Sequence, residues 1–237
     1  MDKLYIVIPV YNEAGAIADV VKEWHAVVDA ISHGSKLVIF NDGSTDNTLE
    51  ILGKIRNQYP DLIVIDKKNT GHGPTCTAAY RYAVAEGADW IFQTDSDGQT
   101  TSDDFRGFWE KRDHFDFIIG WRDQREDGMT KVFVSRMLKL AVFMIFGIML
   151  KDANAPFRLM RTQRLREYLP VIPDDYFLPN TLISVMIANN KEKTSWQKIS
   201  FAPRTSGTSS MPFLKVVRLG MNLTGQLYKM RYVKRPK

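Results

Sequence analysis

The sequence is poor in cysteine and in long apolar runs. Cys76 is the single cysteine of the 237 residues, which excludes an intramolecular disulfide, and no Cys/His cluster has metal-ligand spacing. No stretch reaches the ~18–20 apolar residues that a bilayer-spanning helix needs. The N-terminal apolar run Leu4–Val10 is short, contains Pro9 and lacks a small-residue cleavage site, so we expect no secretion signal. These absences indicate a reducing, cytoplasmic setting and a soluble or peripheral protein.

Acidic residues are missing from positions 193–237, where ten Lys and Arg occur. Because the whole chain has a formal net charge of +5, residues 1–192 carry −5. A basic end on an acidic body indicates an anionic partner. A membrane surface, a phosphorylated ligand and nucleic acid are the candidates.

Short β-branched runs alternate with helical patterns over the first 120 residues. Strands are predicted at Leu4–Val10, Lys36–Asn41, Leu62–Asp66, Trp90–Thr94 and Phe115–Gly120, and helices at Ala14–Ala30, Asp46–Tyr59 and Pro74–Ala88. This alternation predicts an α/β fold with right-handed crossovers and a mostly parallel sheet that carries helices on both faces. In such sheets, ligands bind beyond the carboxyl ends of the strands.

The pattern changes after Gly120. The polar stretch Trp121–Thr130 is predicted to be a mobile loop, and a strongly apolar helix follows over residues 131–150. Further strands are predicted at Pro156–Met160 and Ser195–Phe201, and further helices at Arg161–Leu169 and Leu178–Asn190. We expect one domain over residues 1–212, with halves 1–120 and 121–212, followed by a basic tail helix over residues 213–237.

Carboxylates follow three of the predicted strands. Glu13, Asp42, Asp95 and Asp97 would converge on one edge of a parallel sheet, where they repel one another unless a cation or hydrogen-bond donors compensate. The pair Asp95 and Asp97, with the amide oxygen of Gln99 two residues later, suits Mg²⁺ or Mn²⁺. The alternative is that each carboxylate caps the following helix. Nucleic acid would explain the basic end but not these carboxylates, so we do not expect it as a partner.

Two other phosphate-site motifs fit poorly. The run Gly71-His72-Gly73 follows a strand and opens a helix, but Cys76 stands where the dinucleotide fingerprint has its third glycine. The run Asp95-Ser96-Asp97 is similar to the nucleophile motif of haloacid-type phosphatases, which normally ends the first strand of its domain. We therefore disfavour a dehydrogenase and a phosphatase, and we assign no histidine a role.

Seven runs of the chain resemble family 2 glycosyltransferases of the GT-A fold, in the order in which that family carries them. They are Ile8–Glu13, Asn41–Asp46, Gly71–Pro74, Asp95–Gln99, Val134–Arg136, Asp152–Arg158 and Arg204–Ser209. Within the family, the chain is most similar to dolichol-phosphate mannose synthases and bacterial polyprenyl-phosphate sugar transferases. The resemblance implies a nucleotide-binding half over residues 1–120 and an acceptor half over residues 121–212.

The resemblance also implies site residues. Those that would bind the donor are Pro9, Tyr11, Glu13, Asp42, Asp95 and Arg204. Those that would hold Mg²⁺ or Mn²⁺ against the donor diphosphate are Asp95, Asp97 and Gln99. Those that would face the phosphates of donor and acceptor are Arg122, Ser135 and Arg136, the last two at the acceptor phosphate. The catalytic set would be Asp97, Arg122 and Arg136.

The expected function is metal-dependent transfer of a sugar from a GDP- or UDP-linked donor to a polyprenyl phosphate, with inversion at the sugar. Thr100-Thr101 and Ala155-Pro156 depart from the patterns common in this branch, and they leave the sugar and the acceptor open. The alternatives are a family 2 enzyme with a glycan hydroxyl as acceptor and a non-catalytic module that binds nucleotide sugars. The sequence carries no signal of an oligomeric state.

The chemical class of the acceptor can be inferred from a carboxylate that the sequence lacks. A sugar hydroxyl loses a proton as it attacks, so such acceptors need a carboxylate base. In many family 2 members an acidic residue comes from the region that corresponds to Phe177–Thr181, which holds no carboxylate here, although Asp174 and Asp175 lie just upstream. A phosphate monoester, with a second pKa of about 6, is already largely ionised at neutral pH and needs no base. This favours the phosphate acceptor.

The apolar stretch Met137–Leu150 is interrupted by a single polar residue, Lys139. As a helix it would be about 21 Å long, too short for a hydrocarbon core of ~30 Å. It is either a buried core helix or a helix in the membrane interface. We favour the interface because basic residues flank it and the tail after Phe213 adds seven more. The sequence thus predicts a peripheral protein on the inner, cytoplasmic face of an anionic membrane.

Overall fold

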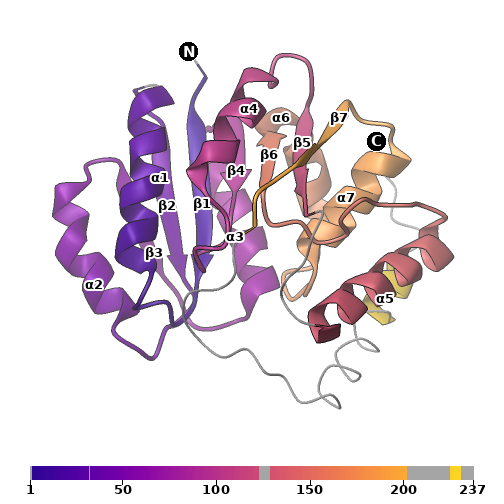
Figure 1. Cartoon of the computed structure of the whole chain (residues 1–237), viewed down its shortest axis with the longest axis horizontal. Helices are drawn as coiled ribbons and strands as arrows, with labels where there is room; N and C mark the ends of the chain where they lie inside the picture. Colours follow the sequence, from indigo (N-terminus) through magenta and orange to yellow (C-terminus); the bar gives the residue numbers. More distant parts are fainter. Residues whose placement is uncertain (1, 32, 123–128, 202–224, 231–237) are drawn as a thin grey trace.

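The computed structural model describes residues 2–31, 33–122, 129–201 and 225–230 (Figure 1). Seven strands form one sheet in the order β3-β2-β1-β4-β6-β5-β7. The strands are β1 Leu4–Val10, β2 Lys36–Asn41, β3 Leu62–Asp66, β4 Trp90–Gln93, β5 Phe117–Trp121, β6 Arg158–Arg161 and β7 Thr194–Lys198. Strand β6 is antiparallel to both of its neighbours, β4 and β5, whereas every other pair is parallel. The predicted mostly parallel α/β sheet is confirmed.

Helices connect the strands. They are α1 Ile17–Ile31, α2 Thr48–Ile55, α3 His72–Ala85, α4 Phe105–Glu110, α5 Met129–Phe146, α6 Thr162–Tyr168 and α7 Pro179–Asn189, with short 3-10 turns at Arg56–Gln58, Ser102–Asp104 and Leu169–Val171. Helix α4 was not predicted, because its six residues are too few to show a helical period. Helix α5 ends earlier than predicted, since Gly147 takes a left-handed φ of +70° and stops the helix.

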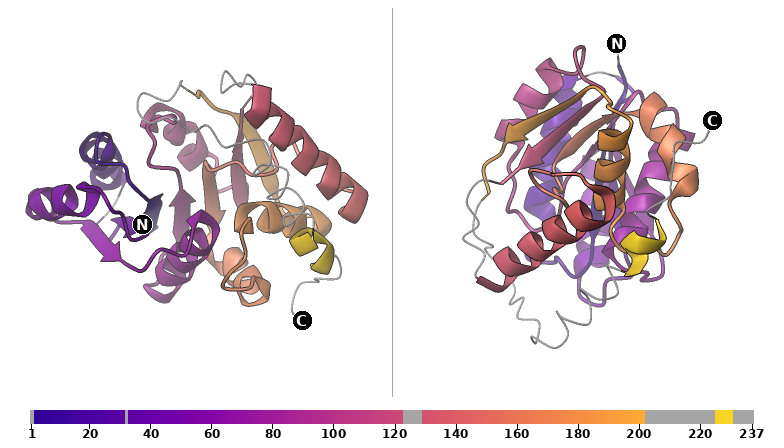
Figure 2. Two further views of the ribbon diagram at one scale, coloured as in Figure 1. Left: turned by 90° about the horizontal axis from the view of Figure 1, so that it is seen from below. Right: turned by 90° about the vertical axis from the view of Figure 1, so that its right-hand side faces the viewer.

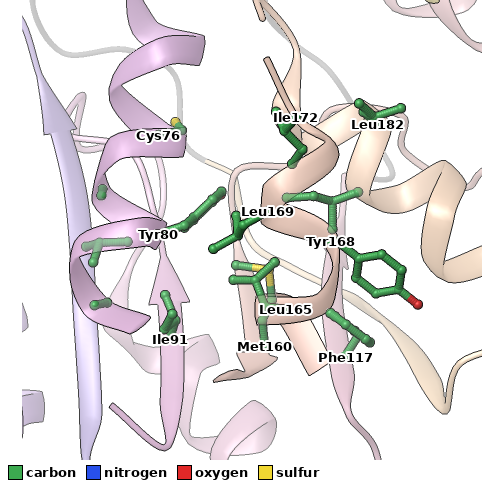
Figure 3. Close-up of a cluster of buried hydrophobic side chains, with 14 of the residues drawn as sticks. Cys76, Tyr80, Ile91, Phe117, Met160, Leu165, Tyr168, Leu169, Ile172 and Leu182 are labelled. Atoms are coloured by element: carbon green, nitrogen blue, oxygen red, sulfur yellow. The ribbon is translucent and has the colours of Figure 1, made fainter. Parts of the chain in front are cut away.

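The sheet is buried on both faces, as the alternation along β1 shows. Tyr5 and Val7 point into a core formed with α3, α6 and α7, where Cys76, Tyr80, Tyr168 and Leu182 gather (Figure 3). Leu4, Ile6, Ile8 and Val10 of the same strand point into a second core formed with α1, α2 and α4. Since both faces are covered, a ligand has access only at the ends of the strands.

Helix α5 packs on the outer side of the molecule, away from α1 and α2 (Figures 1 and 2). Its residues Ala141 and Val142 are buried against Val185 of α7 and against Leu227. Among the helices that the structure describes, none combines the length and apolarity needed to cross a bilayer. The predicted loop over 121–130 and the basic tail over 213–237 fall largely outside the described residues, and the division into halves stays a prediction.

The start of α3 lies directly against the segment that precedes α7. A Cβ on Gly73 would lie 2.1 Å from the carbonyl oxygen of Phe177 and 2.5 Å from its carbonyl carbon, both of them backbone atoms. Real contacts of a Cβ are never this short, so an alanine would force the two segments apart. Glycine at this position therefore sets how closely α3 and the segment before α7 approach each other.

We predict that Gly73→Ala lowers the free energy of unfolding by about 1–3 kcal/mol, the usual result of overpacking. Gly53→Ala is the matched control, because Gly53 lies in α2 and a Cβ there would meet nothing within 4 Å. Removing a glycine from an open helix position should stabilise the protein by about 0.5–1 kcal/mol. Urea unfolding of both variants measures the difference, and equal midpoints would contradict the contact at Phe177.

Candidate active site

A cavity of about 380 Å³ opens at the carboxyl ends of β1, β2 and β4, where the sequence predicted a ligand site. Its lining residues come from four segments that are far apart in the chain. They are Pro9, Val10, Tyr11 and Glu13; Asp42; Asn69, Gly71, His72 and Thr75; and Asp95, Ser96 and Asp97. The structure thus brings the four predicted carboxylates around one cavity.

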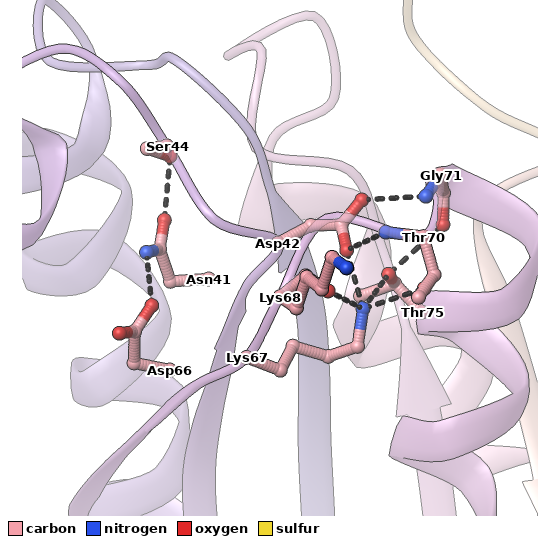
Figure 4. Close-up of polar contacts among 9 residues, drawn as sticks. All are labelled: Asn41, Asp42, Ser44, Asp66, Lys67, Lys68, Thr70, Gly71 and Thr75. Atoms are coloured by element: carbon pink, nitrogen blue, oxygen red, sulfur yellow. Dashed lines mark hydrogen bonds and ion pairs between the residues drawn. The ribbon is translucent and has the colours of Figure 1, made fainter.

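Asp42 follows β2 and is 3% exposed (Figure 4). Its Oδ1 accepts hydrogen bonds from Lys67 Nζ and from the backbone N–H of Thr70, and its Oδ2 accepts one from the N–H of Gly71. Lys67 Nζ also donates to Thr75 Oγ1 over 3.1 Å. Burial would raise the pKa of Asp42, but the hydrogen bonds from Lys67, Thr70 and Thr75 outweigh it and lower that pKa below the ordinary value. This carboxylate therefore ties β2 to the loop that opens α3.

The turn after β1 is bound to the turn after β2. Asn12 takes a left-handed φ of 56°, which asparagine tolerates, and its N–H donates to Ser44 Oγ over 2.9 Å. Asn12 Oδ1 accepts from the N–H of Thr45 over 2.7 Å, and the N–H of Glu13 donates to Thr48 Oγ1 over 2.9 Å. These polar residues thus support the rim of the cavity, on which Glu13 lies.

Asp95 and Asp97 lie in the turn after β4, and both are half-buried. Asp95 Oδ1 accepts from Gln93 Nε2 over 3.2 Å, and Asp97 Oδ1 accepts from the N–H of Gln99 over 3.2 Å. Two carboxylates of one turn that face the same cavity are oxygen donors of the kind that Mg²⁺ and Mn²⁺ prefer. The donor set therefore fits the predicted metal. Gln99, the third predicted ligand, is 3% exposed and is not among the residues that line the cavity.

His72 is the first residue of α3, and its side chain is 48% exposed on the cavity. Its Nε2 lies 3.4 Å from Cys76 Sγ and 3.7 Å from Asp95 Oδ1. The Cys76 sulfur and, to a lesser extent, the Asp95 carboxylate raise the pKa of His72, which favours its cationic form. The sequence assigned this histidine no role, yet it lies beside a predicted metal ligand. Lys67 was also given no role from the sequence. Its position directly after β3, the strand that pairs with the strand before Asp42, could have indicated the contact.

The predicted phosphate-binding residues do not line the cavity. Arg122 is nearly buried, its Nε donates to Asp152 Oδ2 over 2.9 Å, and its guanidinium lies 5.0 Å from the centre of the Phe201 ring. Ser135 is half-buried and Arg136 is exposed on α5, outside the lining. Arg204 lies outside the described residues.

A second group of possible ligands is separate from this cavity. One donor atom from each of His25, Asp29 and Asp61 lies within 4.8 Å of the others. Lys36 Nζ lies 2.6 Å from Asp61 Oδ1 and already offsets the charge of that carboxylate. None of these residues lines the cavity, and the sequence had not indicated them as a group.

The family model described as glycosyl transferase family 2 matches residues 5–178, well over half of the chain. This chain belongs to glycosyl transferase family 2. The matched residues include all four carboxylates of the cavity, and the predicted membership is confirmed.

Curated relatives of this family 2 chain have names that contain polyprenyl phosphates. It is 22% identical over 225 residues to the undecaprenyl-phosphate 4-deoxy-4-formamido-L-arabinose transferase of Pseudomonas paraeruginosa, covering 94% of this chain and 64% of the relative. It is 23% identical over 237 residues to the dodecaprenyl-phosphate galacturonate synthase of Rhizobium johnstonii, covering 99% and 69%. The chain thus spans only about two thirds of the length of these relatives.

Solved structures show the GT-A fold of this family 2 chain. One is glucosyl-3-phosphoglycerate synthase from Mycobacterium tuberculosis in complex with Mn²⁺, uridine-diphosphate-glucose and phosphoglyceric acid. It matches with a TM-score of 0.71 and 16% identity, over 100% of this chain and 81% of the other. At this identity the likeness establishes the fold alone.

We predict that Lys67→Met lowers the free energy of unfolding by about 2 kcal/mol at pH 7, less than the ~3–5 of a fully buried pair because the Lys67 side chain is 22% exposed. Asp42 has a lowered pKa in the folded protein. Its stabilisation is therefore present above the unfolded pKa of about 3.9 and is lost as the pH falls through the folded pKa. The difference between wild type and variant should shrink below about pH 4.

Urea unfolding as a function of pH measures this difference. Lys54→Met is the control, because Lys54 pairs with Glu50 on the surface of α2 and its loss should leave the stability nearly unchanged. A difference between wild type and Lys67→Met that stays constant through the acid range would contradict the ion pair as its source.

Proposed function

We propose that this protein transfers a sugar from a nucleoside-diphosphate sugar to a polyprenyl phosphate. Family membership and the four carboxylates around one cavity support the donor half of this proposal. The names of the relatives, which contain undecaprenyl and dodecaprenyl phosphate, support the acceptor half. The observation that carries the choice of acceptor is the state of Asn180.

Asn180 stands in the segment where a hydroxyl-activating carboxylate would be expected. It is 2% exposed, its Nδ2 donates to Gln93 Oε1 over 2.9 Å, and its Oδ1 accepts from the hydroxyl of Tyr80 over 2.5 Å. An amide that is neutral, buried and bonded at both ends cannot take a proton from an acceptor. Of the two acids just upstream, Asp174 pairs with Arg81, and neither Asp174 nor Asp175 lines the cavity. An acceptor that arrives already ionised is therefore the better fit.

Different residues of the cavity would bind different parts of the nucleotide-sugar donor. Asp95 and Asp97 would hold Mg²⁺ or Mn²⁺, which supplies positive charge for the diphosphate that leaves. Tyr11 is 48% exposed at the cavity and offers an aromatic face to the nucleobase, beside Pro9 and Glu13. This division is compatible with UDP and with GDP. We further propose that the acceptor phosphate attacks the sugar from the side opposite the diphosphate, so that the configuration inverts.

We predict that the purified protein, given Mn²⁺ and a panel of UDP- and GDP-sugars, transfers sugar to a polyprenyl phosphate and not to the matching polyprenol. Formation of radiolabelled glycolipid measures the transfer. Asp97→Ala should abolish transfer and the Mn²⁺-dependent part of donor binding, because it removes a metal ligand from the turn after β4. Efficient transfer to a hydroxyl acceptor, with the polyprenyl phosphate inert, would contradict the acceptor assignment and leave the donor assignment in place.

We also propose that α5 rests on the inner, cytoplasmic surface of an anionic membrane. Its outward face carries Met137 (47% exposed), Leu140 (47%), Phe143 (50%) and Met144 (67%), while its inner face packs on α7. Arg136 at the start of this apolar face is exposed as well. A helix with apolar side chains outward and basic residues beside them suits the boundary between acyl chains and anionic headgroups.

We predict that the double variant Phe143→Gln, Met144→Gln weakens binding to phosphatidylglycerol vesicles about tenfold or more, since each large apolar side chain contributes ~1.5–3 kcal/mol on burial. Vesicle sedimentation measures the binding, which should also fall as salt is added. Leu49→Gln on α2, where the leucine is 38% exposed, is the control and should bind like wild type. Unchanged binding by the double variant would contradict the role of α5.

A further inference from the structure

A chain of buried polar side chains leads from α7 to Asp95. Gln93, the last residue of β4, is fully buried, and its Nε2 donates to Asp95 Oδ1 over 3.2 Å. Its Oε1 accepts from Asn180 Nδ2 over 2.9 Å and lies 3.2 Å from the hydroxyl of Tyr80. That hydroxyl lies closer to Asn180 Oδ1, at 2.5 Å, and donates to it. Three side chains of the core thus end on a carboxylate of the cavity.

The chemistry of the last member sets the direction of the chain. An ionised carboxylate only accepts hydrogen bonds, so Gln93 must present its NH₂ group to Asp95 and its oxygen to the core. That oxygen can only accept, so Asn180 must present its NH₂ group to Gln93. The oxygen of Asn180 then faces the hydroxyl of Tyr80, which donates the hydrogen bond. Every donor points toward Asp95, and the three hydrogen bonds form without an unpaired group.

The inner end of the chain is anchored through the backbone of Asn180. Its carbonyl oxygen accepts from Arg158 Nη1 over 3.1 Å and from Ser184 Oγ over 2.8 Å. Arg158 is fully buried on β6, in register with Gln93 of β4. The backbone of Asn180 is therefore held in place, and its side-chain NH₂ group in turn orients the amide of Gln93.

Apolar side chains of similar volume would fill this part of the core without the desolvation cost of buried amides and a buried hydroxyl. Stability alone therefore does not account for the polar choice at Tyr80, Gln93 and Asn180. The chain delivers a hydrogen bond to one oxygen of Asp95. Holding that oxygen fixes the plane of the carboxylate and the direction in which its remaining lone pairs face the cavity.

We propose that Asn180 and Tyr80 are positioning residues for Asp95, and that they act through Gln93 to set the geometry of the metal site. This inference rests on the proposed function, since it assumes that Asp95 is a metal ligand. Groups that orient a metal ligand typically change metal affinity about 10–100-fold when they are removed, although they never touch the ion.

The test is Mn²⁺ binding, measured by electron paramagnetic resonance with and without UDP or GDP. Asn180→Leu keeps the branched shape of the side chain and removes the hydrogen bond to Gln93, so it should weaken Mn²⁺ binding about tenfold or more. Thr77→Ala is the matched control, because it removes a buried side-chain hydrogen bond, to the carbonyl oxygen of Gly73, in which no member of the Tyr80–Asn180–Gln93 chain takes part. It should lower the thermal midpoint but leave Mn²⁺ affinity unchanged. If Asn180→Leu does not fold, Tyr80→Phe, which removes a single oxygen atom, replaces it with the same expected direction.

The outcomes separate this inference from the proposed function. Wild-type protein whose Mn²⁺ binding is abolished by Asp97→Ala but unchanged by Asn180→Leu or its replacement would overturn the positioning role alone. Loss of stability in these variants without loss of Mn²⁺ affinity would have the same meaning. Wild-type protein that binds no Mn²⁺ would overturn both the metal assignment and this inference.

Discussion

The buried Asp42 carboxylate is the interaction on which the rest of the site depends. It accepts hydrogen bonds from Lys67, at the end of β3, and from two backbone N–H groups that lead into α3. The ends of β2 and β3 and the start of α3 therefore keep one arrangement. Through α3, the same interaction sets where His72 lies relative to the turn after β4. A carboxylate with this many donors stays ionised, and the ammonium group of Lys67 compensates its charge.

The strands, the mostly parallel sheet and the four carboxylates were predictable because each follows from a local pattern. Alternating β-branched runs locate the strands, and parallel strands bring their ends to one edge, so Glu13, Asp42, Asp95 and Asp97 had to meet. The partners of these groups were not predictable. That Lys67 neutralises Asp42 depends on the pairing of β2 with β3, and that Arg122 binds Asp152 depends on a contact between positions 30 residues apart.

In the part of the chain after residue 120, the elements were again predictable and their contacts were not. An apolar helix after residue 130 was predictable from composition, but which of its faces packs on α7 was not, because apolar residues occur all around it. The sequence indicated the absence of a carboxylate near Asn180, whereas the hydrogen bonds of that residue join positions 80, 93 and 180. Contacts between such distant positions come from the topology of the sheet and leave no periodic trace.

The order of the strands also has a consequence for synthesis. Strand β6 lies between β4 and β5 in the sheet, yet it is made after both of them. Until Arg158–Arg161 has left the ribosome, the outer edge of β4 has no partner and its backbone groups can pair with another chain. The nascent protein thus has an open, apolar sheet edge while the residues between β4 and β6, including α4, β5 and α5, are translated. This interval is the stage at which a chaperone or a pause in translation would do most to prevent misassembly.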